Sequence, residues 1–122
     1  MPIKTSSAKA KGRELQKHVV ARVKEVFPWL KGDDVVSRPM GSGGSDLILS
    51  PYAIKTLPIS FECKKTKKTP SRGELDQSTA NVYEDTIPCV VWCPHGKGHN
   101  KSMIMFDLDE FLLWFKKHRE NI

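Results

Sequence analysis

Apolar side chains recur every three or four positions through residues 10–27, and short β-branched segments follow them along the chain. That spacing predicts one amphipathic helix, which Pro28 and Gly32 end. β-Branched and aromatic residues bounded by glycine and proline then predict strands at residues 34–38, 45–50 and 59–65. The first half of the chain therefore predicts a helix followed by three short strands.

The second half of the chain predicts a helix, two strands and a last helix. Ser71 and Glu74 have the spacing of a capping box, which opens a helix running to about Glu84. Further strands are predicted at residues 87–92 and 102–106, with a turn at 93–100 between them and a final helix at 107–118. This order of elements predicts an α/β domain in which helices flank a mixed five-stranded sheet.

Length and composition predict one intracellular domain. The 122 residues fit a single domain, which we place at residues 10–122, and the polar, basic residues 1–9 predict a disordered arm. The N-terminal residues have no apolar stretch typical of a secretory signal, and the longest apolar run, at 104–115, is interrupted by acids. An odd count of 3 cysteines fits reduced thiols. We therefore expect a cytoplasmic protein that does not contact a membrane.

The charge balance indicates a polyanionic partner. Lys and Arg number 20 against 14 Asp and Glu, which gives a formal net charge of +6. Such an excess favours nucleic acid over other partners. A basic cluster that could contact phosphates without reading sequence comprises Lys64, Lys65, Lys67, Lys68 and Arg72. A solvated basic turn is the alternative interpretation of this cluster.

Two acids and a lysine are predicted to meet on adjacent strands. Glu62 and Lys64 are separated by one residue, so the alternation of a strand places both on one face. If residues 51–58 form the loop of an antiparallel hairpin, Asp46 lies opposite Glu62. Cross-strand partners have Cβ atoms roughly 4.5–5.5 Å apart, which is close enough to share a metal ion. A solvated strand face is the alternative, because Glu-x-Lys alone is a common pattern.

Phosphodiester hydrolysis uses this combination of groups. A divalent cation neutralises the scissile phosphate and lowers the pKa of the attacking water, and hard cations such as Mg²⁺ prefer carboxylate oxygens. A nearby lysine can orient the water or stabilise developing charge. Glycines within residues 41–44 precede Asp46 and would let a phosphate approach the backbone. The pattern therefore favours a metal-dependent nuclease.

The chain resembles the PD-(D/E)XK nuclease superfamily, and within it the archaeal-type Holliday junction resolvases. The resemblance is carried by KGRE at residues 11–14, RPMGSGGSD at 38–46 and FECK at 61–64, over roughly the first two-thirds of the chain. The strict Pro-Asp dipeptide is absent, because Ser45 precedes Asp46. The resemblance implies a restriction-endonuclease-like core. The spacing is more specific for the superfamily than for junction resolution.

The resemblance implies catalytic roles residue by residue. Asp46 and Glu62 would bind the metal ion, and Lys64 would position or activate the water. Glu14 on the first helix would complete the acidic cluster and also ligate the metal, although an exposed Glu paired with a neighbouring lysine is the alternative. Ser42 would place its hydroxyl beside the scissile phosphate, or would be an ordinary loop serine.

The resemblance also implies contacts that support binding. Arg38 would bind phosphate, Lys11 and Arg13 would contact DNA from the first helix, and Gln77 would support the site from the helix that follows the Glu-x-Lys strand. A strand-end arginine is commonplace, so the pattern alone does not decide the role of Arg38.

The family's activity supplies the functional hypothesis. It implies a Mg²⁺-dependent endodeoxyribonuclease, with Mn²⁺ as a substitute, that acts as a homodimer and nicks opposed strands of a four-way junction. A compact enzyme of this kind fits an archaeon or a virus, in which case it would act in the host cytoplasm. Residues 111–115 are apolar nearly all round and could form part of a dimer surface, or could pack deeply as a C-terminal helix.

Three other hypotheses stay open. The chain could be a less selective nuclease of the same superfamily, or a non-catalytic DNA-binding module of the same fold. A zinc-stabilised interaction protein is the third, because cysteine and histidine ligate zinc. Its candidate ligands are Cys89, Cys93, His95 and His99, although they contain no Cys-x-x-Cys pair.

Overall fold

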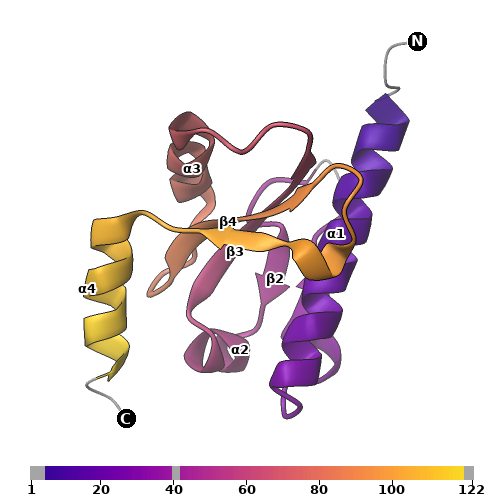
Figure 1. The fold of residues 1–122 in the computed structure, drawn as a ribbon. Coiled ribbons are helices and arrows are strands. Elements are labelled where there is room, and N and C mark those ends of the chain that lie inside the picture. The colour runs from indigo at the N-terminus through magenta and orange to yellow at the C-terminus, as the bar shows by residue number, and fades with distance from the viewer. Residues whose placement is uncertain (1–4, 40–41, 120–122) are drawn as a thin grey trace.

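The computed structural model describes residues 5–39 and 42–119 of the chain, and within them the fold is α/β (Figure 1). The order of elements agrees with the sequence prediction except for one additional short helix between the second and third strands. The elements are α1 (Thr5–Val26), β1 (Val35–Ser37), β2 (Leu47–Leu49), α2 (Pro51–Thr56), β3 (Ile59–Thr66), α3 (Arg72–Ser78), β4 (Ile87–Pro94), β5 (Met103–Met105) and α4 (Leu108–Arg119). Single 3₁₀ turns lie at Gly32–Asp34, Thr79–Asn81 and His99–Lys101.

The first helix begins earlier than predicted. It starts at Thr5 rather than at about residue 10, so residues 5–9 of the predicted disordered arm are helical, and residues 1–4 lie outside the described residues. The apolar stripe of α1 faces the core, because Leu15, Val19 and Val23 are buried there. Burial of that stripe against the strands stabilises the helix more than its intrinsic propensity does.

The predicted five-stranded sheet is wrong, because the strands form two small sheets. β1 pairs antiparallel with β2, with Val36 opposite Ile48. β3 pairs parallel with β4, and β4 pairs antiparallel with β5. Where β2 and β3 approach each other, the Asp46 N–H donates to the Phe61 carbonyl at 2.9 Å. The Cys63 N–H, which would bond to a backbone carbonyl in a regular ladder, donates instead to the Asp46 carboxylate at 2.7 Å.

The connection between β2 and β3 is helical rather than a hairpin loop. Ser50 is the N-cap of α2 and its hydroxyl accepts a hydrogen bond from the Ala53 N–H, while Pro51 occupies the first turn. Both are strong helix-start signals, because proline has no N–H to leave unsatisfied there. Asp46 still lies beside Glu62, but through this helical connection and not through the predicted hairpin.

Parallel pairing of β3 with β4 fixes the positions of Glu62 and Lys64. Glu62 is paired in register with Val90, and Lys64 with Trp92. The connection between the two strands contains α3, whose predicted capping box is confirmed: Ser71 and Glu74 each accept from the other's backbone N–H. The helix ends at Ser78, followed by a 3₁₀ turn, and so is shorter than the predicted helix to about Glu84.

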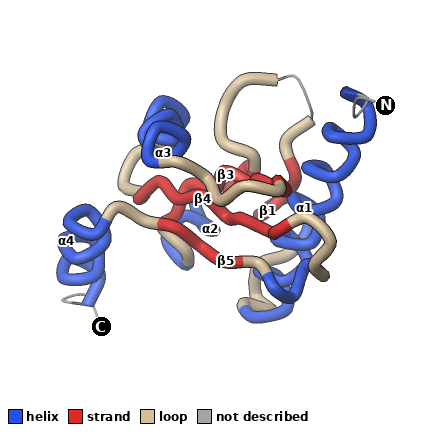
Figure 2. Tube along the Cα trace, turned by 45° about the horizontal axis from the view of Figure 1, so that its top comes forward, coloured by secondary structure: helices blue, strands red, loops and turns tan. Residues whose placement is uncertain are grey.

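The core lies between α1 and the strands, with the other helices around the strands (Figure 2). The largest fully buried side chains include Leu15, Leu30, Leu47 and Val35. Figures 1 and 2 both place α1 and α4 at opposite ends of the molecule. None of the described helices combines the length and the apolar content that crossing a bilayer requires.

The last helix is only partly packed. None of its described residues is buried, although Phe111 and Trp114 pack against the core and the Trp114 indole N–H donates to the Pro58 carbonyl at 2.9 Å. Leu108 and Leu113 are each 70% exposed. The alternative of a deeply packed C-terminal helix is therefore wrong.

Candidate active site

A cleft of about 200 Å³ lies where α1, the loop after β1 and the middle of β3 meet. Its lining contains two of the three predicted metal-binding acids, the predicted lysine, and the predicted serine and arginine. The residues that line it are Gly12, Gln16, Arg38, Pro39, Ser42, Asp46, Glu62, Cys63 and Lys64. Residues 40 and 41, which belong to the glycine-containing loop predicted to accept phosphate, lie outside the described residues.

Asp46 is fixed beside Glu62 by backbone hydrogen bonds on both sides of that residue. Its N–H donates to the carbonyl of Phe61 at 2.9 Å, and its carboxylate accepts from the N–H of Cys63 at 2.7 Å. Ser45 adds a third bond, because its hydroxyl donates to the same Phe61 carbonyl at 3.1 Å. The junction between the two sheets therefore places two carboxylates together, with Lys64 on the same face of β3 as Glu62.

Partial burial raises the pKa of both carboxyl groups. For Asp46 burial is the largest cause, opposed by the Cys63 N–H and by the charges of Lys64 and Arg38. For Glu62 burial again comes first, the negative charge of Asp46 raises the pKa further, and Lys64 lowers it. Each acid therefore makes ionisation of the other more costly, and a cation between them would relieve that cost.

The pair suits a hard divalent cation with few protein ligands. Among residues 5–39 and 42–119, no group of three or more His, Cys, Asp or Glu side chains lies close enough together to hold a metal ion. Mg²⁺ commonly keeps several waters and takes only one or two carboxylates together with substrate phosphates. The chemistry of Asp46 and Glu62 fits that pattern.

The structure does not bring Glu14 to the cleft. Its side chain is exposed, and its charge acts on His99, on the side of α1 that faces the turn after β4. Successive helical residues are rotated by about 100°, so Gly12 and Gln16, one turn apart, face the cleft while Glu14 between them turns away. The prediction that Glu14 ligates the metal is therefore wrong for this structure.

Gln16 is the cleft residue that the sequence analysis missed. It is only 4% exposed, and its side-chain oxygen accepts a hydrogen bond from the Ser37 hydroxyl at 2.7 Å. The sequence contained a signal for this residue. The apolar stripe shows which face of the helix points to the core, and the polar Gln16 lies directly after Leu15 at the edge of that face. Gln16 thus occupies the position beside the carboxylates that was expected for an acid.

Arg38 lies in the cleft but is also held by its own loop. Its guanidinium donates to the Ser45 carbonyl and to the Tyr83 hydroxyl, the latter at 3.0 Å. Gly44 has φ +110°, and a Cβ there would lie 2.7 Å from the Arg38 Cζ atom. Tyr83, which the sequence analysis did not single out, therefore helps to position the arginine against Asp46.

Ser42 lines the cleft from the same loop. Its hydroxyl donates to the Pro39 carbonyl at 2.8 Å, and the residue is exposed. Ser42 therefore lies at the cleft, and its contact with the scissile phosphate stays a prediction.

The predicted DNA-binding residues fall into different environments. Lys67 and Lys68 are exposed in the turn after β3, and Arg13 is exposed on α1. Arg72 is different, because it pairs with Asp107 at 2.7 Å and with Asp76 at 3.0 Å. These acids raise the pKa of Arg72 and tie α3 to the start of α4, so its charge is already balanced within the protein.

Gln77 is exposed on α3 and does not line the cleft. Lys65 points away from the cleft, with its ammonium 3.4 Å from the Lys97 carbonyl. Lys11 lies 3.3 Å from the His95 ring nitrogen. The structure therefore brings Lys64 to the carboxylates, and Lys65 and Lys11 to the turn after β4.

The candidate zinc ligands do not converge. Cys89 and Cys93 are buried free thiols, and burial is the main cause of the raised pKa of Cys89. His95 faces Lys11, whereas the ring of His99 lies 5.2 Å from that of His18. Within the described ranges these four side chains form no set of metal ligands.

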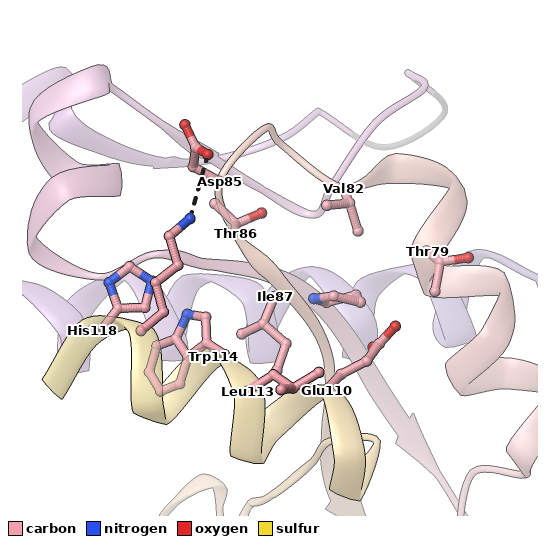
Figure 3. Close-up of a pocket in the computed structure, with 11 residues that line it drawn as sticks. Thr79, Val82, Asp85, Thr86, Ile87, Glu110, Leu113, Trp114 and His118 are labelled. Carbon is pink, nitrogen blue, oxygen red and sulfur yellow. Dashed lines mark ion pairs between the residues drawn. The ribbon is translucent and has the colours of Figure 1, made fainter. Parts of the chain in front are cut away.

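A second pocket, of about 460 Å³, lies far along the chain from the carboxylates, between α4 and the segment before β4 (Figure 3). Ile87, Leu113 and Trp114 form an apolar floor, and an ion pair of 3.8 Å joins Asp85 to Lys117 at its edge. Glu110 also lines this pocket, which contains neither Asp46 nor Glu62.

Comparisons with known proteins found no match: no protein-family model, curated protein or solved structure proved significantly similar to this chain.

Proposed function

We propose that this protein is a Mg²⁺-dependent endodeoxyribonuclease of the PD-(D/E)XK type that resolves four-way DNA junctions. One observation carries the proposal: the cleft gathers Asp46, Glu62 and Lys64, with the Asp46 carboxylate hydrogen-bonded to the residue between the other two. Metal-dependent hydrolysis of a phosphodiester uses acids to hold the ion and a cationic group to stabilise developing charge, and this set supplies both. The fold proposed to carry them is a restriction-endonuclease-like core whose sheet is interrupted at the Asp46–Phe61 contact.

Asp46 and Glu62 would hold the Mg²⁺ ion, with Mn²⁺ as a substitute. When bound, the ion would neutralise the scissile phosphate and lower the pKa of the attacking water. Lys64 would orient that water, and Gln16 would support the wall of the cleft through its hydrogen bond with Ser37. Water oxygen forms the new bond to phosphorus, the bond to the 3′ oxygen breaks, and the 3′ oxygen leaves with a proton.

Arg38 and Ser42 are proposed to position the strand that is cut. Arg38 contributes positive charge at the cleft, and this charge partly opposes the increase that burial causes in the pKa of Asp46. Ser42 presents a hydroxyl on the loop that closes the cleft. Both groups bind phosphate oxygens rather than bases, so they support cutting without sequence readout.

The choice of a four-way junction rests on a further proposal, that the protein is a homodimer. We also propose that it acts in the cytoplasm. Paired symmetric nicks require two active sites related by a twofold axis. A group of exposed apolar residues on β5 and α4 is the surface proposed for the dimer: Met103, Ile104, Leu108, Leu112, Leu113 and Phe115. The buried free thiols fit a reducing compartment.

Cleavage of a labelled synthetic four-way junction, compared with a linear duplex of matched sequence, tests this function. We expect paired, symmetric nicks in the junction with Mg²⁺, none with EDTA, and none from Glu62→Gln. The matched control is Glu84→Gln, which changes an exposed acid remote from the cleft lining.

Each contrary outcome points to a different protein. Equal cutting of duplex and junction would retain the active site and reject the resolvase, leaving a less selective nuclease. Junction binding without any cutting, in both Mg²⁺ and Mn²⁺, would indicate a non-catalytic DNA-binding module.

A further inference from the structure

Basic side chains gather on the other side of the end of β3, facing away from the cleft. We call this group the histidine–lysine patch, and it consists of Lys11, His18, Lys65, His95 and His99. The members come from α1, from β3 and from the turn between β4 and β5, which runs alongside α1 (Figure 1). Three segments far apart in the sequence therefore contribute positive or protonatable groups to one place.

Two contacts within the patch join one basic side chain to another. The Lys11 ammonium lies 3.3 Å from the His95 Nε2 atom. The rings of His18 and His99 are 5.2 Å apart. The Lys65 ammonium donates to the backbone carbonyl of Lys97 at 3.4 Å, which holds it beside the same turn. Bringing like-charged groups this close is unfavourable unless some of them stay neutral or an anion lies between them.

Few acids face these groups. Glu14 on α1 is the acid whose charge acts on His99. Glu25 lies farther along α1, in the pocket shared with His18 and His99, but it is paired with Arg22, which also lines that pocket. Lys65 faces His99 from β3. The patch therefore has an excess of basic groups.

These surroundings lower the pKa of His99. Burial is the largest cause of its lowered pKa, the charges of Lys65 and His18 lower it further, and Glu14 opposes them. An anion arriving beside the ring would raise that pKa, because it stabilises the protonated form. Anion binding at the patch should then be accompanied by proton uptake.

The patch adjoins the candidate active site through two elements. On α1, Gly12 lines the cleft and the adjacent Lys11 belongs to the patch. On β3, Lys64 lines the cleft, and Lys65 projects to the opposite side of the strand. A DNA strand crossing the end of β3 would therefore meet the cleft and the patch in succession.

We infer that the histidine–lysine patch binds a backbone phosphate of the DNA strand beside the cut, and that it does so with uptake of a proton at His99. This inference rests on the proposed nuclease function, because that function supplies the DNA. It adds a place for the flanking strand and a dependence of affinity on pH.

Binding of the native protein to fluorescently labelled duplex and junction in EDTA, where no cutting occurs, tests the inference. Between pH 8 and pH 6 we expect the dissociation constant to fall by up to about tenfold per pH unit for each proton taken up. His99→Asn should flatten that dependence. Lys11→Gln/Lys65→Gln should weaken binding severalfold and reduce the salt slope by about 1, because the contacts to one phosphate are lost.

The matched control is Lys55→Gln/Lys116→Gln, which removes the same charge from exposed positions on α2 and α4. An equal loss of affinity in this control would overturn the inference, because net charge alone would then explain binding. A flat pH profile in the native protein, with His99→Asn unchanged from it, would overturn it too.

Failure of the inference and failure of the nuclease function are distinguishable. If the junction is cut with Mg²⁺ but the patch variants bind normally, the nuclease stands and the patch does not. If nothing is cut but binding depends on the patch and on pH, the patch stands as a phosphate site of a non-catalytic module.

Discussion

At the scale of single residues, the carboxyl pair links stability to pH. The pKa values of Asp46 and Glu62 are raised above the ordinary values of 3.8 and 4.5, so the native state holds protons that the unfolded chain has already released. The free energy of unfolding therefore falls as the pH rises through the window that starts near those values and ends at the raised ones. The pair contributes least to stability above that window.

Removing one charge of the pair should stabilise the protein without metal. We expect Glu62→Gln to raise the melting temperature at pH 7 in EDTA by roughly 3 °C, while abolishing cleavage. Mg²⁺ should raise the melting temperature of the native protein and much less that of the variant. Differential scanning calorimetry measures both effects. A lower melting temperature for Glu62→Gln than for Glu84→Gln would contradict the repulsion between the two carboxylates.

A second prediction at this scale separates Gln16 from Glu14. Gln16→Ala removes the side chain that bonds Ser37 and lines the cleft, and we expect cleavage to fall by on the order of tenfold or more. Glu14→Ala, only two positions away but exposed, should leave cleavage nearly unchanged. Measured rates on the same junction decide between them, with melting temperatures as the check on folding. A larger loss from Glu14→Ala would restore the acid as a metal ligand.

These two positions also show what the sequence could predict of the site. Glu62 and Lys64 were predicted together because the two-residue period of a strand determines which side chains share a face. Asp46 was placed beside them from a hairpin, and α2 makes that connection instead. Glu14 was assigned from a resemblance, which gives a position along a helix but not its rotation. The burial of Leu15 settles that rotation, and it directs Gln16 rather than Glu14 to the cleft.

At the scale of elements, the loop before β2 depends on one glycine. Gly44 has φ +110°, and a Cβ there would meet the Arg38 guanidinium. We expect Gly44→Ala to cost about 1–3 kcal/mol in stability and to weaken cleavage by displacing Arg38. Urea denaturation and cleavage rates measure the two effects. Gly43→Ala is the control, because a Cβ there meets nothing within 4 Å, and equal effects of both changes would reject this explanation.

The element order was largely predictable, whereas the joining of the sheets was not. Apolar periodicity and the Ser71–Glu74 capping box located most helices and strands. The five-stranded sheet failed at Asp46, whose carboxylate takes the Cys63 N–H that a regular ladder would use. Whether a side chain or a backbone carbonyl accepts that bond depends on tertiary placement, which the local sequence does not encode. Ser50 and Pro51 did signal α2, and the predicted loop overlooked them.

At the scale of the whole molecule, charge and apolar surface lie at different ends. The cleft and the histidine–lysine patch adjoin the N-terminal part of α1, whereas α4 lies at the opposite end (Figures 1 and 2). Leu112 is 54% exposed and Leu113 70% exposed, and Leu113 also lines the apolar pocket of Figure 3. A DNA-binding end and an apolar end can act at the same time, which two subunits gripping one junction would require.

This arrangement predicts that charged substitutions in the apolar surface of α4 uncouple the two nicks without abolishing cleavage. Leu112→Glu/Leu113→Glu should raise the dimer dissociation constant by on the order of 100-fold, because it removes two apolar side chains from the interface. Light scattering during size exclusion measures the mass. The same variant should still nick individual strands of the junction, since its cleft is intact. Its two nicks should no longer be paired.

Tyr52→Glu is the control for that experiment, because Tyr52 is 53% exposed on α2, outside the proposed surface. It should remain dimeric and give paired nicks. A native protein that is monomeric at every concentration would exclude the dimer, and paired cutting would then need two monomers to bind one junction independently. Paired nicks from a double-leucine variant that stays dimeric would instead move the interface elsewhere, because coupled cutting needs two clefts held in a fixed relation, whichever surface holds them.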